Sequence, residues 1–185
     1  VECTVVVGGK VVNTGKCGEN ITWTYYDDNS LVFSGSGEME EYYEDCWYQP
    51  ANVLIPWYAY SPMVKEIIIE EGITNITAFA FIDCKNVQKI SISDSVVKIG
   101  HCAFEHWNNY EGFVLNKSIT ELGKMVFHSC SFNVYYEGSE QDFNAIKVPL
   151  VNKGWNAEFN GTLLFYSETA QQGCWHYVDG VPTIW

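Results

Sequence analysis

The middle third of the chain repeats its pattern of apolar residues every 23 positions, and this period restricts the fold more than any other feature. A fixed period of about 20–29 residues with several apolar columns is typical of a solenoid, in which coils stack on one another. A solenoid offers an extended surface rather than a buried reaction chamber. The columns are Ile67, Ile90 and Phe113; Ile69, Ile92 and Leu115; Ile73, Val96 and Ile119; Ile76, Ile99 and Leu122; and the pairs Ala80-Phe81, Ala103-Phe104 and Val126-Phe127.

Each repeat opens with a short alternating segment that predicts a strand, at residues 66–69, 89–92 and 112–115. Alternation places every second side chain on the buried face of the strand. A turn follows, and then we expect a short helical turn that contains the Ala-Phe column. One coil cannot bury its apolar side alone, so stacking should form two continuous ladders. These are Phe81, Phe104 and Phe127 in one ladder, and Ile67, Ile90, Phe113 and Val134 in the other.

Terminal coils of a solenoid need caps that cover their open ends. The predicted organisation is an N-terminal β cap and connection at 1–63, repeats at 64–86, 87–109 and 110–131, a shortened strand at 132–136, and a C-terminal cap at 137–185. In the first cap we expect hairpins from strands 4–7 and 10–12 and from strands 21–25 and 31–34. In the second cap we expect a helix starting near Ser139, a strand at 163–166, and a hairpin of 175–178 with 181–185. Pro182 favours an edge position in that hairpin.

Composition excludes some classes of partner. Ten basic residues stand against 23 acidic ones, for a formal charge of −13, and binding to nucleic acid requires clustered Lys and Arg. No apolar run approaches the length of a membrane span, so we expect no membrane insertion. Residues 1–7 do not resemble a signal peptide. If the protein is exported, we expect that the signal has been removed.

Seven cysteines is an odd number, so at least one thiol is unpaired within the chain. Cys84 and Cys130 occupy the same place in the first and third repeats, and Trp107 fills it in the second. Two coil steps separate these cysteines by roughly 10 Å, which is too far for a disulfide. We therefore expect both to be small buried residues. A disulfide between Cys3 and Cys17 remains an open alternative.

The sequence offers no convincing catalytic or metal-binding set. Cys102 has His106 four residues on, but it aligns with the apolar Phe79 and Met125 of the other repeats, which favours core packing over nucleophilic catalysis. The spacing of His106, His128 and Cys130 matches no paired-ligand zinc pattern. We therefore expect no catalytic residue, no metal and no cofactor.

A binding surface on such a solenoid would most simply use the outward positions of the strands. Ile68, Val114 and Tyr135 would form a small apolar stripe with polar groups at its rim. The alternative is that this stripe is ordinary β-surface or is covered by a cap segment. The candidate binding residues are Glu66, Ile68, Glu70, Lys89, Ser91, Ser93, Val114, Asn116 and Tyr135.

Several segments resemble the BspA-like leucine-rich-repeat surface proteins. Residues 96–104, Val-Val-Lys-Ile-Gly-His-Cys-Ala-Phe, are similar to the core of the family's repeat, and residues 64–76 are similar to its first repeat. Residues 17–39 resemble the segment that often precedes the array. Residues 134–146 and 175–182 resemble its exit and its ending. The resemblance implies an exported bacterial protein associated with adhesion or with binding to macromolecules, and it supplies no catalytic residue.

The sequence therefore predicts a β-rich α/β solenoid, a short leucine-rich-repeat array with β-hairpin caps. The leading functional hypothesis is a non-enzymatic extracellular binding or adhesion module whose partner is a protein or a glycan. The second hypothesis is a structural spacer or accessory domain of a larger secreted protein. The third is a thiol hydrolase that uses Cys102.

Overall fold

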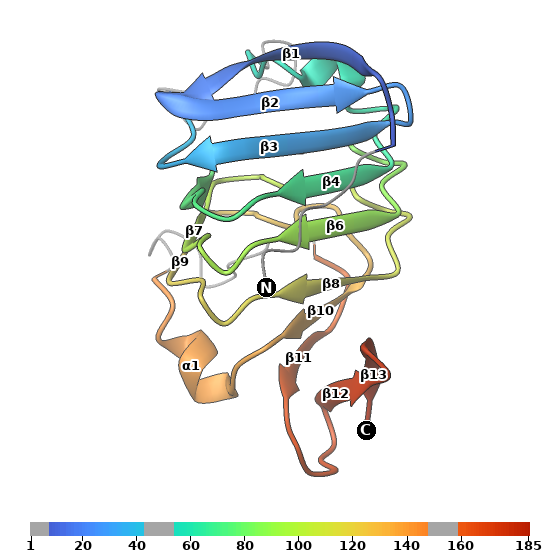
Figure 1. The fold of residues 1–185 in the computed structure, drawn as a ribbon. Helices are drawn as coiled ribbons and strands as arrows, with labels where there is room; N and C mark the ends of the chain where they lie inside the picture. The colour runs from blue at the N-terminus through green and yellow to red at the C-terminus, as the bar shows by residue number, and fades with distance from the viewer. Residues whose placement is uncertain (1–7, 43–53, 148–158) are drawn as a thin grey trace.

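A computed structural model describes residues 8–42, 54–147 and 159–185. Short strands lie one above another along one side of the molecule (Figure 1). Two five-stranded sheets share this side, in the orders β1-β2-β3-β4-β6 and β13-β12-β11-β10-β8. The strands are β1 (Val11–Gly18), β2 (Asn20–Tyr26), β3 (Ser30–Ser36), β4 (Glu66–Ile69), β6 (Lys89–Ile92), β8 (Gly112–Leu115), β10 (Asn133–Tyr136), β11 (Leu163–Tyr166), β12 (Cys174–Val178) and β13 (Val181–Ile184).

The pairing register follows the 23-residue period. β4 pairs in parallel with β6 so that Ile67 lies opposite Ile90. A second ladder of two-residue strands, β5 (Asn75–Ile76), β7 (Lys98–Ile99) and β9 (Glu121–Leu122), is also parallel and keeps the same step. Equivalent residues of successive coils therefore lie over one another, as the period predicts.

The phenylalanine ladder is confirmed. The ring centroids of Phe81 and Phe104 lie 5.6 Å apart, and those of Phe104 and Phe127 lie 5.6 Å apart, both pairs stacked. All three side chains are fully buried. Phe33 of β3 extends the ladder toward the N-terminus, with its ring edge-on to Phe81 at 5.5 Å. The hairpin strands and the repeats thus share one hydrophobic core.

The expected helical turn around the Ala-Phe column is wrong. Phe79 and Asp83 have left-handed backbones, with φ of 58° and 61°, and the same places one and two coils later are also left-handed. The N–H groups of Phe79, Phe81 and Asp83 donate to carbonyl oxygens of the next coil at 2.8, 2.9 and 3.1 Å. A helix would use these donors within its own segment. In this turn, every second backbone N–H group instead donates a hydrogen bond to the neighbouring coil.

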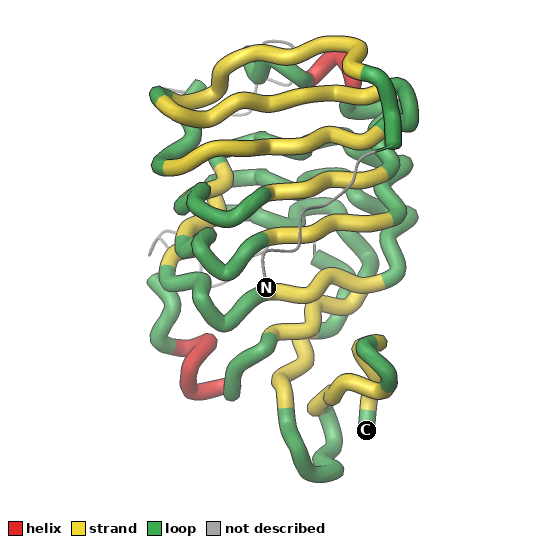
Figure 2. The backbone as a smooth tube through the Cα atoms, viewed as in Figure 1, coloured by secondary structure: helices red, strands yellow, loops and turns green. Residues whose placement is uncertain are grey.

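The fold is accordingly dominated by strands and turns. Figure 2 shows helix only at α1 (Glu140–Asn144) and at the 3-10 turn η2 (Tyr58–Tyr60) among the described residues. The β-rich repeat architecture is confirmed, whereas the α component of the predicted α/β solenoid is not. α1 begins where the sequence predicts it, because the Ser139 side chain accepts the N–H of Asp142 in a capping box.

The N-terminal strands agree with prediction in part. β2 and β3 form the expected antiparallel pair. β1 extends to Gly18 and pairs with β2, so the predicted strand 10–12 is too short. The predicted strand 4–7 lies outside the described residues. In this part of the chain, β3 runs parallel to β4 and joins the hairpin to the first repeat.

The C-terminal strands agree more closely. β11 and the β12–β13 hairpin form where expected, and Pro182 lies on the edge strand of its sheet. The division into caps and repeats stays a prediction.

Cys84, Trp107 and Cys130 occupy equivalent buried places. The Trp107 Nε1–H donates to the carbonyl oxygen of Phe81 at 2.8 Å, and the Cys130 thiol donates to that of Phe104 at 3.1 Å. Trp107 thus keeps the hydrogen bond that a thiol makes elsewhere. Burial raises the pKa of the Cys84 and Cys130 thiols to about 12. Cys17 is also a buried free thiol, and Cys3, considered above as an alternative disulfide partner, lies outside the described residues.

The strand stack is interrupted between β6 and β8, and we call this boundary the seam. β6 and β8 belong to different sheets, and no backbone hydrogen bond joins residues 89–92 to residues 112–115. The Tyr110 hydroxyl is hydrogen-bonded to the backbone of Ile90, and the Asn116 side-chain amide donates to the carbonyl oxygen of Ile92 at 3.0 Å. These side chains therefore satisfy backbone groups that a parallel ladder would use.

The same two coils stay joined behind the seam. Ile99 of β7 pairs with Leu122 of β9, and the N–H of Phe104 donates to the carbonyl oxygen of Val126 at 2.9 Å. Only the front strands separate. As a result Ile90, predicted to be buried in its ladder, is partly exposed, while Ile67 and Phe113 are fully buried.

Candidate functional site

A groove of about 340 Å³ lies over the seam. The two strands of the seam and their flanking residues form its floor, and the β12–β13 hairpin forms its wall. The floor residues are Ile90, Ser91, Ile92, Asp94, Tyr110, Gly112, Val114 and Asn116, and the remaining lining residues are Glu137, Tyr177, Gly180 and Pro182.

Three of the nine candidate binding residues line this groove: Ser91, Val114 and Asn116. The others lie elsewhere on the outward rows. Lys89 Nζ and Glu66 Oε1 form an ion pair at 2.7 Å across β4 and β6. The Ser93 hydroxyl donates to the backbone carbonyl of Glu70 at 3.1 Å. These four residues therefore bond across neighbouring coils on one side of the groove.

The expected apolar stripe of Ile68, Val114 and Tyr135 does not form. Ile68 is only 2% exposed, so it offers no accessible surface, and Val32, its pairing partner in β3, is 4% exposed. Both stand outside the main hydrophobic cluster, which indicates burial on the outward face. Tyr135 is partly covered by Trp175 of β12, with the ring centroids 5.4 Å apart.

The wall of the groove is held by one tyrosine–carboxylate contact. The Tyr177 hydroxyl donates to Glu137 Oε1 at 2.8 Å. Burial and this bond to an acidic group raise the pKa of Tyr177. Glu137 and Tyr177 are not among the nine candidate binding residues predicted from the sequence. The hairpin itself was predicted, but nothing in the local sequence indicates that it packs beside the strand face.

The groove is acidic and aromatic. Asp94 and Glu137 supply carboxylates, Tyr110 and Tyr177 supply rings, and none of the described lining residues is basic. Burial raises the pKa of Tyr110, so its hydroxyl stays neutral. A neighbouring hollow of about 410 Å³ shares Asp94, Glu137 and Tyr177 and adds Lys117 and Tyr166. The arrangement suits a ligand that combines positive charge with flat apolar surface.

Comparison with known proteins agrees with this architecture. Residues 55–146 match the BspA type leucine rich repeat region, in six copies. These residues belong to the BspA-type leucine-rich-repeat family. The matched region contains β4 to β10 together with both sides of the seam. The resemblance drawn from residues 64–76 and 96–104 is therefore confirmed.

A solved structure with a similar fold is a leucine-rich repeat protein from Eubacterium ventriosum. It is 24% identical in sequence with a TM-score of 0.59, and the match covers 85% of this chain and 38% of that one. The present chain thus spans well under half the length of that protein. Among curated proteins none matches this chain.

Leucine-rich-repeat proteins commonly bind other proteins through their extended surfaces. The BspA-type region of this chain belongs to this general class of repeat. In the described part of the chain, no helix has the length and apolar character to cross a membrane.

The structure gives the thiol hydrolase hypothesis no support. Cys102 lies in the BspA-type region, is 1% exposed, and has a left-handed backbone, φ 50°. Its Sγ lies 3.3 Å from His101 Nε2. His101 Nδ1 is buried and has no hydrogen-bond partner among the described residues. A nucleophilic pair needs a third group that orients the imidazole and access for a substrate.

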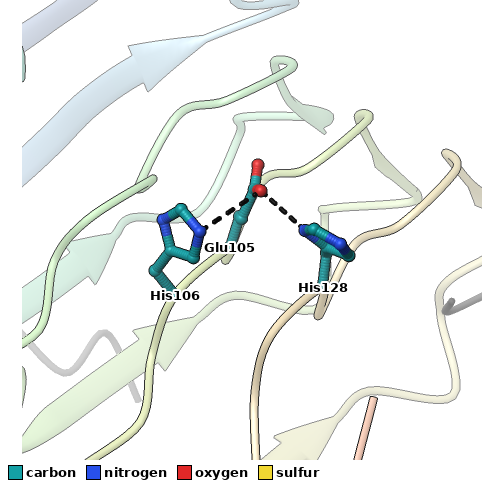
Figure 3. A group of neighbouring side chains, drawn as sticks. All are labelled: Glu105, His106 and His128. Carbon is teal, nitrogen blue, oxygen red and sulfur yellow. Dashed lines mark hydrogen bonds and ion pairs between the residues drawn. The ribbon is translucent and has the colours of Figure 1, made fainter. Parts of the chain in front are cut away.

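The residues considered for metal binding are only partly brought together. His106 and His128 lie on the turn side of neighbouring coils and share a carboxylate between them (Figure 3). Cys130 instead bonds backbone carbonyls. Sequence reasoning missed the shared carboxylate, Glu105. The available signal was the 23-residue step, because Glu105 stands 23 residues before His128 and the two side chains therefore occupy equivalent places in neighbouring coils.

Proposed function

We propose that this chain is a non-enzymatic extracellular binding or adhesion module, and that its groove takes an extended, basic segment of a protein partner. The observation that supports the proposal is the groove over the seam, which two carboxylates and two tyrosines line without a basic residue. Long-range attraction adds to the fit, because the whole chain has a formal charge of −13.

The chemistry of recognition follows from the lining. Asp94 is exposed and Glu137 is partly exposed, so both carboxylates are accessible to a Lys or Arg side chain. Tyr110 and Tyr177 offer ring faces to its aliphatic stem or its guanidinium group. Ser91 and Asn116 line the floor with polar groups. An extended segment fits better than a globular domain, because a groove of about 340 Å³ holds only a few side chains.

The extracellular setting rests on the family. BspA-like proteins are typically surface-located or secreted, and the repeat region here belongs to that family. An exported adhesion module would meet basic segments of host or environmental proteins. Its affinity should fall with ionic strength, because exposed charges are screened within about 10 Å at 0.1 M salt.

The experiment compares the purified chain with two charge-reversal variants. Asp94→Lys changes the groove, whereas Glu71→Lys changes an exposed carboxylate that does not line it. Binding to a panel of Lys- and Arg-containing peptides, charge-neutral peptides and immobilised glycans is measured by fluorescence anisotropy and surface plasmon resonance. We expect saturable binding to basic peptides, weakened at least about ten-fold by Asp94→Lys and little by Glu71→Lys.

Two results would contradict the proposal. Equal loss of binding in both variants would indicate unspecific attraction to a negative protein. Saturable binding to glycans alone would replace the protein partner with a carbohydrate. If no ligand binds, the structural spacer or accessory domain of a larger secreted protein becomes the better description.

A further inference from the structure

We propose that Glu105, His106 and His128 form a binding site for a divalent transition metal of the zinc type, which bridges two coils of the array. One ligand atom from each residue lies within 4.8 Å of the others. Glu105 and His106 come from one coil and His128 from the next, so a bound ion would link the two coils that separate at the seam.

Glu105 is the residue that most needs explanation. Its side chain is fully buried in the column that Ile82 occupies one coil earlier. Burying a carboxylate is costly unless its oxygens are paired. Oε1 accepts the Nδ1–H of His128 at 2.6 Å, but Oε2 is buried and has no hydrogen-bond partner among the described residues. One hydrogen bond compensates only part of the negative charge of this carboxylate in its low-dielectric surroundings. A cation beside the carboxylate would compensate the rest.

His106 is oriented as a metal ligand would be. Its Nδ1 lies 3.1 Å from Asp83 Oδ1, and Asp83 is also paired with Lys85 Nζ at 3.0 Å. A carboxylate only accepts, so in the neutral imidazole of His106 the proton sits on Nδ1 and the lone pair of Nε2 faces Glu105 Oε1 at 3.5 Å. Two acceptors that face each other need a proton or a cation between them. Carboxylate–histidine–metal arrangements of this kind are general in metalloproteins.

The ligand set selects the class of metal. Two imidazole nitrogens and one carboxylate oxygen suit zinc, and also cobalt, nickel and copper. Calcium and magnesium require oxygen ligands. The side chains of His106 and His128 are 27% and 14% exposed, so an ion and a water molecule in the fourth position can enter from their side. Tetrahedral coordination with metal–ligand distances of about 2.0–2.2 Å requires Glu105 Oε1 and His128 Nδ1, now 2.6 Å apart, to separate by nearly 1 Å and the Nδ1 proton of His128 to move to Nε2 or to solvent.

The test uses the whole chain, freed of metal by a chelator and desalting. Zn²⁺ is titrated by isothermal titration calorimetry into the wild type and into Glu105→Gln, His106→Gln, His128→Gln and, as a matched control, His176→Gln. His176 stacks on Trp185 and lies outside the cluster. We expect one ion per chain, affinity lowered at least about ten-fold in each cluster variant, and no change in the control.

Circular dichroism establishes that each variant folds. The side chain of His106 is partly exposed, so His106→Gln should fold even if the variants of more deeply buried residues do not, and the test then rests on it. Zn²⁺ should raise the thermal midpoint of the wild type and not of that variant. Cobalt should give the ligand-field bands of a nitrogen–oxygen tetrahedral site. The proposal is overturned if the wild type binds no Zn²⁺, if His176→Gln is the variant that loses binding, if Ca²⁺ binds more tightly than Zn²⁺, or if cobalt gives a thiolate charge-transfer band.

Discussion

Phe81 and Phe104 are separated by 23 residues in the chain, yet their rings stack with centroids 5.6 Å apart and an interplanar angle of 23°. Phe127 continues the stack at the same centroid spacing. Because each ring covers the next, every coil depends on its neighbours for burial of its apolar side. This dependence also explains how the front strands can separate at the seam while the coils stay joined.

Replacing the central ring should destabilise the whole array. We expect Phe104→Ala to lower the free energy of unfolding by about 3–5 kcal/mol, because it leaves a cavity between two stacked rings. Urea denaturation followed by tryptophan fluorescence measures the change. Val181→Ala, at a side chain that is 62% exposed, serves as the control and should change stability by less than about 0.5 kcal/mol. A loss below about 1 kcal/mol in Phe104→Ala would argue against a continuous ladder.

Gly100 lies where the backbones of two coils approach closely. A Cβ at this position would lie 2.4 Å from the backbone nitrogen of Ala78, and backbone atoms cannot move aside cheaply. We expect Gly100→Ala to cost about 1–3 kcal/mol. Gly8→Ala is the matched control, since a Cβ there meets nothing within 4 Å. Similar denaturation midpoints for the two variants would contradict the close stacking.

The indole of Trp107 provides a hydrogen bond as well as volume. Trp107→Phe keeps an aromatic ring but removes the indole donor to the carbonyl oxygen of Phe81, which then keeps only the longer bond from the N–H of Cys84 at 3.3 Å. We expect a loss of about 1–3 kcal/mol in the free energy of unfolding. Trp185→Phe removes a comparable but exposed bond to Ser167 and should have little effect. Equal stability of the two variants would contradict a structural role for the Trp107 bond.

The buried thiols should make the protein less stable at alkaline pH. Burial raises the pKa of Cys17, Cys84 and Cys130 from 9.0 to about 12. Above about pH 9 the unfolded chain releases these protons while the folded chain keeps them, so stability falls as pH rises. Where a thiol is ionised in the unfolded chain and still protonated in the folded chain, it lowers the free energy of unfolding by about 1.4 kcal/mol per pH unit.

Urea denaturation between pH 8 and 10 measures this slope, to which tyrosines with raised pKa values add as the pH nears 10. Cys84→Ala should make the slope shallower, because one of the buried thiols is then missing. A free energy of unfolding that stays constant from pH 8 to 10 would show that the thiols are not buried as described.

Much of the repeat region could be predicted from the sequence. Residues 66–69, 89–92 and 112–115 all have apolar side chains at their second and fourth places, which is enough to place β4, β6 and β8, and the step from Phe81 to Phe104 gives their stacking. These features are local or periodic, so the pattern alone contains them. The left-handed turns at Phe79 and Cys102 were missed because a non-glycine residue gives no sign of positive φ.

The candidate sites were harder to predict because they depend on contacts between distant segments. The seam depends on side chains of Tyr110 and Asn116 that bond to the preceding strand, and the 23-residue period continues across it unchanged. The position of Tyr177 beside Glu137 depends on where the C-terminal hairpin packs. Glu105 was not singled out in the sequence, and only the full coil shows that it is buried.

Amide hydrogen exchange at the seam tests most directly whether the groove is a built-in feature of the fold. Ser91 of β6 lies in the continuous ladder with β4, whereas Val114 occupies the equivalent place in β8 and faces the seam. By nuclear magnetic resonance, the account predicts that the Val114 amide exchanges at least about ten times faster than the Ser91 amide. Equal protection of the two amides would mean that β6 and β8 pair as one sheet, and the proposed binding groove would then have no basis.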